Sequence, residues 1–359
     1  MEPLKEMFNK KFYQKLSDEL AAVDKIFDPK KFYKAVTHQM EPLSLNERLR
    51  NTSIQMKKHL PHDYRKNITM MKKVAEKMPK GYTALIYPDY IGLYGHEDRE
   101  FSLEALAYFT SFGSSEFAIR EFLKRNLKPT LKTMESWADN KSDHIRRLAS
   151  EGSRPRLPWS FKLDEIIKDP NLTRNILEKL NADTSLYVRK SVANHLNDFS
   201  KDHPEYMLGV VSKWNKENDY TAWIVKHACR TLIKKGNEKA LGIFSFDKNI
   251  QVKLNTLTLN KEKITLGDRL EFDFTLASQS KKSQKLVVDY CIHYFKKNGT
   301  SPKVFKFKEI VLQPGEKRAF KKTQLFVDLT TRKHYPGKHV LEILVNGNVL
   351  GSKEFMLKL

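Results

Sequence analysis

IRRLASE at residues 145–151, VRKSVAN at 188–194 and IVKHACR at 224–230 are three versions of one short pattern. Each begins with an apolar residue, has a basic residue two positions on, and has a small residue five positions on. The copies begin 43 and 36 residues apart. A period of this length is typical of HEAT-like α-solenoids, in which each helix pair needs its neighbours to bury its apolar face. We therefore expect a right-handed superhelix of helix pairs.

The helix pairs can be placed on the sequence. One pair is expected over 170–181 and 186–199, and the next over 204–214 and 220–235. In the helix over 186–199, apolar residues recur at helical spacing and define its buried face. These residues are Val188, Val192, Leu196 and Phe199.

A second face of the same helix is polar. It carries Lys190, Asn194 and Asp198 at intervals of four residues. Lys226 and Arg230 occupy the same register in the next unit, and Arg147 occupies it in the preceding one. Stacked units then align Arg147, Lys190 and Lys226 into a basic column, which suits binding to a phosphate backbone.

The pattern changes near residue 251. Short alternating segments follow, separated by turn dipeptides such as Asn298-Gly299 and Asn346-Gly347. Several strands at roughly ten-residue spacing are typical of an immunoglobulin-like β-sandwich. The sequence thus predicts a mainly α multidomain protein, with a HEAT-like helical domain over 1–246 and a small β-sandwich over 251–359.

The net charge favours a polyanionic partner. The 359 residues include 65 Lys and Arg against 43 Asp and Glu, a net charge of +22. Nucleic acid is the first candidate and an anionic membrane surface the second, although solubility alone is also an explanation. Residues 251–359 contribute 21 basic and 10 acidic residues, or +11. Their lysines either contact the polyanion or protect sheet edges from aggregation.

Several classes of protein are disfavoured. The two cysteines, Cys229 and Cys291, indicate neither a disulfide framework nor a thiolate metal cage, and they fit a reducing cytoplasm. No apolar run approaches the ~18 residues that a membrane span needs. The histidines lack the spacing of paired metal ligands, and neither a glycine-rich phosphate loop nor a Ser/His/Asp order stands out. We expect no metal, no cofactor and no membrane association.

The segment DHIRRLASEGSRPRLPW, residues 143–159, carries an unusual density of arginine. Guanidinium groups bind phosphates bidentately, and a proline-stiffened loop can hold them at fixed positions. The alternative is that the arginines form a solvated face and that Trp159 is ordinary core. The candidate phosphate-binding arginines are Arg146, Arg147, Arg154 and Arg156.

This segment resembles a motif of the AlkC branch of the AlkC/AlkD alkylpurine DNA glycosylases. MEPLKEMFN at 1–9, PDYIGLYG at 88–95 and FTSFGSSEFAIREF at 109–122 resemble the same family in order and spacing. The resemblance covers roughly residues 1–245, and one subgroup of the family also has an immunoglobulin-like tail. It implies hydrolysis of the N-glycosidic bond of cationic alkylated bases in DNA, such as 3-methyladenine and 3-methylcytosine.

The resemblance also implies site residues. Glu116 in SSEF and Asp198 in NHLND match the family's catalytic acids, and Trp159 matches an aromatic of its lesion site. Without the resemblance, Glu116 reads as a favourable charge at a helix N-terminus and Asp198 as a residue near a helix C-terminus. Trp159 offers a face that attracts a cation.

The sequence therefore favours a monofunctional, metal-independent DNA glycosylase in which Glu116 and Asp198 stabilise a sugar cation. We expect a cytoplasmic monomer acting on double-stranded DNA, with Lys190, Asn194, Lys226 and Arg230 added to the DNA-binding arginines. The chief alternative is a non-enzymatic HEAT-repeat module that binds bent or branched nucleic acid. A protein-binding scaffold is a third possibility.

Overall fold

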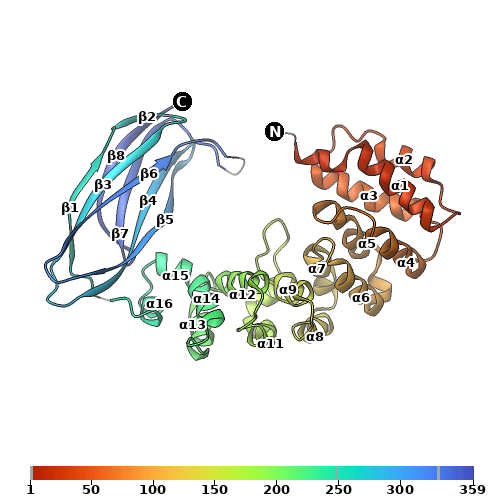
Figure 1. The fold of residues 1–359 in the computed structure, drawn as a ribbon, viewed down its shortest axis with the longest axis horizontal. Helices are drawn as coiled ribbons and strands as arrows, with labels where there is room; N and C mark the ends of the chain where they lie inside the picture. Colours follow the sequence, from red (N-terminus) through yellow and green to blue (C-terminus); the bar gives the residue numbers. More distant parts are fainter. Residues whose placement is uncertain (1–2, 248, 330–331) are drawn as a thin grey trace. The chain divides into compact units, whose positions relative to one another are not determined.

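The computed structural model describes residues 3–247, 249–329 and 332–359, so Met1 and Glu2 of the first family-like motif lie outside the described residues. Helices occupy the chain as far as residue 243 and strands follow from residue 252, as the sequence predicts (Figure 1). The helices are η1 (Leu4–Phe8), α1 (Lys10–Val23), α2 (Pro29–Thr37), α3 (Leu45–His59), α4 (Tyr64–Ala75), η2 (Tyr82–Leu85), α5 (Ile86–Tyr94), η3 (His96–Asp98), α6 (Arg99–Phe109), α7 (Glu116–Arg125), α8 (Leu127–Trp137), α9 (Asp143–Gly152), α10 (Asp164–Lys168), η4 (Pro170–Thr173), α11 (Arg174–Lys179), α12 (Leu186–Phe199), α13 (Pro204–Lys213), α14 (Asp219–Ala228), α15 (Arg230–Lys234) and α16 (Glu238–Ile243).

The repeated seven-residue pattern corresponds to three neighbouring helices. α12 packs against both α9 and α14, and these three helices carry the three copies of the pattern. The apolar face of α12 is buried as expected, and the small residues Ser150, Ala193 and Cys229 are buried in all three copies. The same row continues toward the N-terminus, because α9 packs against α7, α7 against α5, and α5 against α3.

Two of the expected helices are interrupted. The helix expected over 170–181 consists of the short η4 and then α11. The helix expected over 220–235 ends at Ala228, and α15 begins at Arg230 after a turn at Cys229. Lys226 and Arg230 therefore do not lie on one continuous helix, which corrects the register predicted for them.

The C-terminal strands form two sheets. A three-stranded sheet has the order β1-β3-β6, and a five-stranded sheet has the order β2-β8-β7-β4-β5. The pairs are antiparallel except for β2 with β8. Asn346 and Gly347 both have positive φ, of 48° and 81°, and form the tight turn between β7 and β8 that an Asn-Gly pair predicts. The strands are β1 (Val252–Leu259), β2 (Lys263–Thr265), β3 (Arg269–Ser278), β4 (Gln284–Lys296), β5 (Gly299–Leu312), β6 (Lys317–Leu325), β7 (Gly337–Val345) and β8 (Asn348–Lys358).

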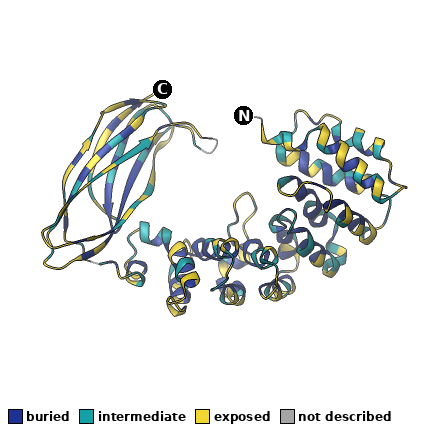
Figure 2. Ribbon diagram, viewed as in Figure 1, coloured by how far each residue is buried: buried dark blue, intermediate teal, exposed yellow. Residues whose placement is uncertain are grey.

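The strands enclose a core made of alternating residues, and β4 shows it most plainly. Leu286, Val288, Tyr290 and Ile292 are buried in this core, and buried residues recur along the neighbouring strands (Figure 2). Because successive side chains of a strand point to opposite faces of the sheet, the side chains of the intervening residues of β4 project from the face opposite the core. This opposite face of β4 includes Val287, Cys291 and His293.

The chain divides into two compact units. One comprises residues 1–207 with 213–228, and the other comprises 208–212 with 229–359. Leu241 and Phe246 pack against Val287, so the last helices belong with the sheets. The boundary between 246 and 251 stays a prediction, and Lys248 within it lies outside the described residues. In the described part of the chain, no helix is both long and apolar enough to cross a membrane.

Candidate active site

The loop between α9 and α10 presents Trp159 to solvent. Its side chain is 86% exposed and its backbone is left-handed, with φ of 65°, so Trp159 is not part of the core. Arg120 of α7 is fully buried and donates hydrogen bonds to the carbonyl oxygens of Gly152 (3.1 Å), Arg154 (2.6 Å) and Phe161. These hydrogen bonds fix both ends of the loop, so the exposed indole is carried by a loop whose backbone is held in place.

Trp159 lines two cavities of about 510 and 520 Å³. The second of these, which we call the Glu116 cavity, is lined by both charged and aromatic side chains. Arg147 and His144 from α9 line it together with Tyr187, whose ring lies 4.6 Å from the Arg147 guanidinium. Aromatic faces such as that of Trp159 attract organic cations.

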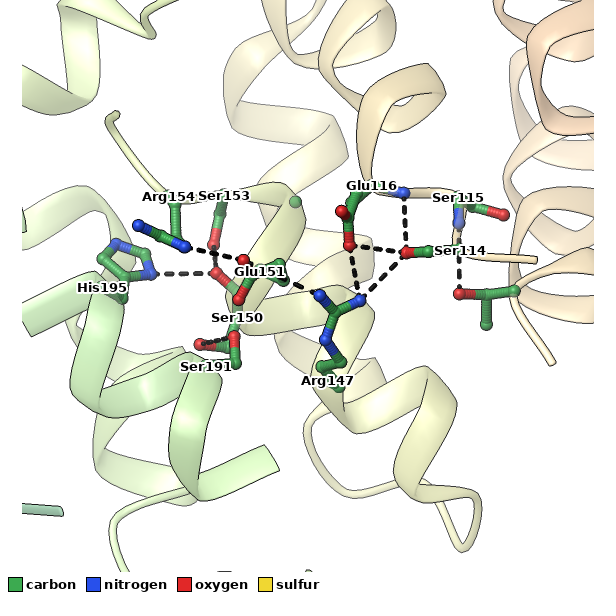
Figure 3. Close-up of polar contacts among 12 residues, drawn as sticks. Ser114, Ser115, Glu116, Arg147, Ser150, Glu151, Ser153, Arg154, Ser191 and His195 are labelled. Carbon is green, nitrogen blue, oxygen red and sulfur yellow. Dashed lines mark hydrogen bonds and ion pairs between the residues drawn. The ribbon is translucent and has the colours of Figure 1, made fainter. Parts of the chain in front are cut away.

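Glu116 is held at the first residue of α7. Its carboxylate Oε2 accepts a hydrogen bond from the Ser114 hydroxyl at 2.6 Å and one from Arg147 Nη1 at 2.5 Å (Figure 3). The side chains of Glu116 and Arg147 are each 14% exposed. The start of the helix and both donors place positive potential beside this carboxylate.

Asp198 lies near the end of α12 and is buried. Arg154 donates to it bidentately, from Nε at 2.9 Å and from Nη2 at 3.2 Å. Burial raises the pKa of the Asp198 carboxyl above its ordinary value, although the ion pair with Arg154 opposes this. Asp198 lines neither cavity. Its principal polar contact is Arg154.

Glu151 joins the two carboxylate sites into one network. Its Oε1 accepts a hydrogen bond from Arg154 Nη1 at 2.7 Å and lies 3.7 Å from Arg147 Nη2 (Figure 3). Alternating charges therefore run from Glu116 through Arg147, Glu151 and Arg154 to Asp198. We call this set the carboxylate network. It connects α7, α9 and α12, which are consecutive helices of the packed row.

The other predicted DNA-binding residues differ in their exposure and in whether a carboxylate already binds them. Arg146 pairs with Asp183 at 2.6 and 3.0 Å, and Arg156 pairs with Asp202 at 2.8 to 3.0 Å. Each of these guanidinium groups is already paired with a carboxylate, so phosphate binding by Arg146 and Arg156 stays a prediction. On α12, α14 and α15, Lys190 and Lys226 are exposed, whereas Asn194 and Arg230 are half-buried.

Family models match two parts of the chain, and similar proteins cover nearly all of it. Residues 99–232 match a model described as a DNA alkylation repair enzyme, and residues 253–359 match the C-terminal Ig-like domain of the uncharacterised protein YhaZ. YhaZ of Bacillus subtilis (strain 168) is 38% identical over 99% of this chain and 100% of its own length. The Pseudomonas fluorescens alkylpurine DNA glycosylase AlkC, solved bound to DNA containing an abasic site analog, is 46% identical over 100% of both chains, with a TM-score of 0.96.

The chain belongs to the AlkC family of alkylpurine DNA glycosylases. Its order of a helical domain followed by an Ig-like domain is the order of the AlkC structure. The fold and family predicted from the sequence are therefore confirmed.

Sequence reasoning missed three contributors to the site of this AlkC-family chain. Glu151 follows Arg147 by four residues and so shares its predicted polar face, but its bridging position requires knowing that two arginines converge on it. Arg120 lies between the buried residues Ile119 and Phe122, and an arginine at such a position signals buried acceptors. Tyr187 lies near the start of α12, one residue before its apolar face, and no sequence signal distinguishes it.

Proposed function

We propose that this AlkC-family chain is a base-excision repair glycosylase that hydrolyses the N-glycosidic bond of cationic alkylated bases, such as 3-methyladenine and 3-methylcytosine, in DNA. The observation that carries the proposal is the carboxylate network, which connects Asp198 to Glu116, and Glu116 lines a cavity together with the exposed Trp159. The Pseudomonas fluorescens relative was solved with an abasic site analog, and an abasic site is what base removal leaves.

Hydrolysis of the N-glycosidic bond of a cationic base places few demands on the protein, and a carboxylate meets them. A base with a fixed positive charge becomes neutral as it leaves, so departure needs no general acid. What remains is to stabilise the oxocarbenium-like sugar and to position a water molecule. Glu116 lines a cavity with Trp159 and supplies negative charge there. The indole face attracts the cationic base by ~1 to 2 kcal/mol when water is excluded.

Asp198 takes part through Arg154. Its carboxylate is buried and held by that guanidinium. A DNA phosphate competes for the same guanidinium, because Arg binds phosphate and carboxylate with the same bidentate geometry. We propose that DNA binding draws Arg154 from Asp198 and so releases the second carboxylate for the sugar and the water.

The proposed reaction is monofunctional and needs no metal or cofactor. A glycosylase that also cleaves the strand uses an amine that forms an imine with the sugar. Among the described residues that line the two cavities, none is a lysine. Water is then the nucleophile, and carboxylates are sufficient to activate it.

Double-stranded DNA is the proposed partner of a cytoplasmic monomer. Lys190 and Lys226 are exposed and offer charge to phosphates. Arg146, Arg147 and Arg156 join them if their carboxylate partners yield to phosphate, as proposed for Arg154. Asn194 and Arg230 complete the proposed contact surface.

Release of free base tests the proposal against the alternative of a non-enzymatic binding module. The purified chain is incubated with methylated duplex DNA in the presence of a chelator, and free 3-methyladenine and 3-methylcytosine are measured by chromatography. We expect both bases to be released and the abasic strands to remain unbroken. The matched control is the Glu116→Gln, Asp198→Asn double variant. DNA binding with no more release than this variant would favour the binding module.

A further inference from the structure

Three side chains of the types that ligate metals meet on the five-stranded sheet, in the compact unit that does not hold the carboxylate network. Cys291 and His293 are two residues apart on β4, so their side chains project from the same face of the sheet. Glu342 of β7 pairs directly with Cys291 in the antiparallel register. Spacing along the sequence does not reveal this set, because its third member comes from another strand.

The donor atoms are close enough to share one ion. The Cys291 sulfur, a ring nitrogen of His293 and a carboxylate oxygen of Glu342 all lie within 4.8 Å of one another. Two ligands on one zinc ion are roughly 3.5 Å apart, given bond lengths of about 2.0 to 2.3 Å. Small side-chain rotations therefore bring these donors to metal-binding positions without moving the strands.

The polar groups of the cluster are incompletely satisfied. His293 Nε2 lies 2.8 Å from Glu342 Oε2, yet it lacks hydrogen-bond geometry toward any acceptor among the described residues. Cys291 is a buried free thiol. Asp289 is also buried and lies on the same face of β4. A cation is the group that would use all of these donors at once.

We propose that Cys291, His293 and Glu342 form a binding site for a divalent transition-metal ion, with zinc as the best fit. A thiolate, an imidazole and a carboxylate are the donors that zinc accepts, and three protein ligands leave a fourth position for water. The site joins β4 to β7 and takes no part in base hydrolysis. It is therefore independent of the proposed function, which is tested with a chelator present.

Cobalt binding to the full-length chain tests the site. The protein is stripped with a chelator and titrated with Co²⁺, whose bond to a thiolate gives a near-ultraviolet charge-transfer band. We expect one equivalent to bind with this band and to be displaced by Zn²⁺. Cys291→Ser should abolish the band. Glu342→Gln should keep the band at saturation but weaken binding by more than the roughly 10- to 100-fold that removing a hydrogen-bond partner of a metal ligand costs.

The other cysteine provides the matched control. Cys229 is equally buried but lies outside the cluster, so Cys229→Ser should bind cobalt as the parent does. Circular dichroism of each variant in chelator confirms that it is folded. If a folded Cys291 variant is unobtainable, His293→Gln and Glu342→Gln decide. The proposal is overturned if the parent shows no charge-transfer band at one equivalent, or if folded cluster variants bind with the parent's affinity.

Discussion

His195 shows how strongly the interior of the helical domain selects one protonation state. Its Nδ1 lies 3.0 Å from the Ser150 carbonyl oxygen and its Nε2 lies 3.2 Å from the Thr173 hydroxyl. A neutral ring satisfies both contacts when Nδ1 donates to the carbonyl and Nε2 accepts from the hydroxyl. Burial lowers the pKa of His195 to about 3, with Arg154 and Arg120 adding to the effect.

This histidine predicts acid sensitivity. The pKa is lower in the folded than in the unfolded protein, where it is near 6.5, so between these values only the unfolded state gains a proton. Stability should therefore fall as pH falls below about 6.5, by up to about 1.4 kcal/mol per pH unit from this group.

Urea unfolding at several pH values, followed by tryptophan fluorescence, measures this dependence. All four tryptophans lie within residues 137–223, so the signal reports the helical domain. His195→Asn keeps a donor near the Ser150 carbonyl but cannot be protonated. It should be less stable at neutral pH and less dependent on pH. An equally steep dependence in this variant would show that other groups cause the acid sensitivity.

At the scale of the element, the loop that carries Trp159 makes the clearest prediction. Trp159→Leu keeps bulk and removes the aromatic face, so single-turnover release of cationic 3-methyladenine should fall about 10-fold, as expected for ~1 to 2 kcal/mol. Thermal stability should change little, because the side chain is 86% exposed. Trp137→Leu is the matched control, because Trp137 is only 9% exposed. It should lower stability and leave turnover per folded molecule unchanged, and the reverse pattern would refute the proposed role of Trp159.

The elements differ in how well the sequence predicts them. α12 begins at Leu186 and ends at Phe199 as expected, because its apolar residues recur with an unbroken period. The turn at Cys229 could not be predicted, because the helical spacing of apolar and basic residues continues through it as far as Lys234. Local propensity does not report such a break when the residues on both sides favour a helix.

The active-site network lies beyond sequence reasoning for a different reason. Periodicity indicates which face of a helix Asp198 occupies, and the family resemblance indicates its importance. Neither indicates that Arg154 would bind this carboxylate in place of a phosphate, because the two residues are far apart in the chain and meet only through helix packing. Burial of Asp198 follows from the same packing.

At the scale of the whole molecule, charge is the feature to test. The net charge of +11 on residues 251–359 predicts that the β-domain contributes to DNA affinity. Removing this segment would uncover Leu241 and Phe246, which pack on its sheet, so neutralising exposed lysines is the cleaner change. The exposed positions chosen are Lys253, Lys308, Lys317, Lys353 and Lys358.

Glutamine at these five positions should weaken DNA binding and flatten its salt dependence. The slope of log affinity against log salt should fall by about 0.9 for each DNA phosphate that the variant no longer neutralises. Binding isotherms at four or more salt concentrations give the slope. Lys338→Gln serves as a control, because Lys338 is paired with Glu354 at 2.6 Å and should matter less. An unchanged slope and affinity would mean that the lysines act only to keep sheet edges soluble.

The central claim is that Glu116 and Asp198 lower the barrier to base release and do not serve binding. Single-turnover release of 3-methyladenine at saturating enzyme, compared among the parent, Glu116→Gln and Asp198→Asn, tests it most directly. Each carboxylate attracts the sugar only as it becomes positive, so either amide should slow release by on the order of 10²- to 10³-fold. Dissociation constants for lesion DNA at the same salt should be unchanged or smaller, because an anion has been removed near phosphates. Weaker binding with an unaltered rate at saturation would contradict the claim and assign both acids to structure.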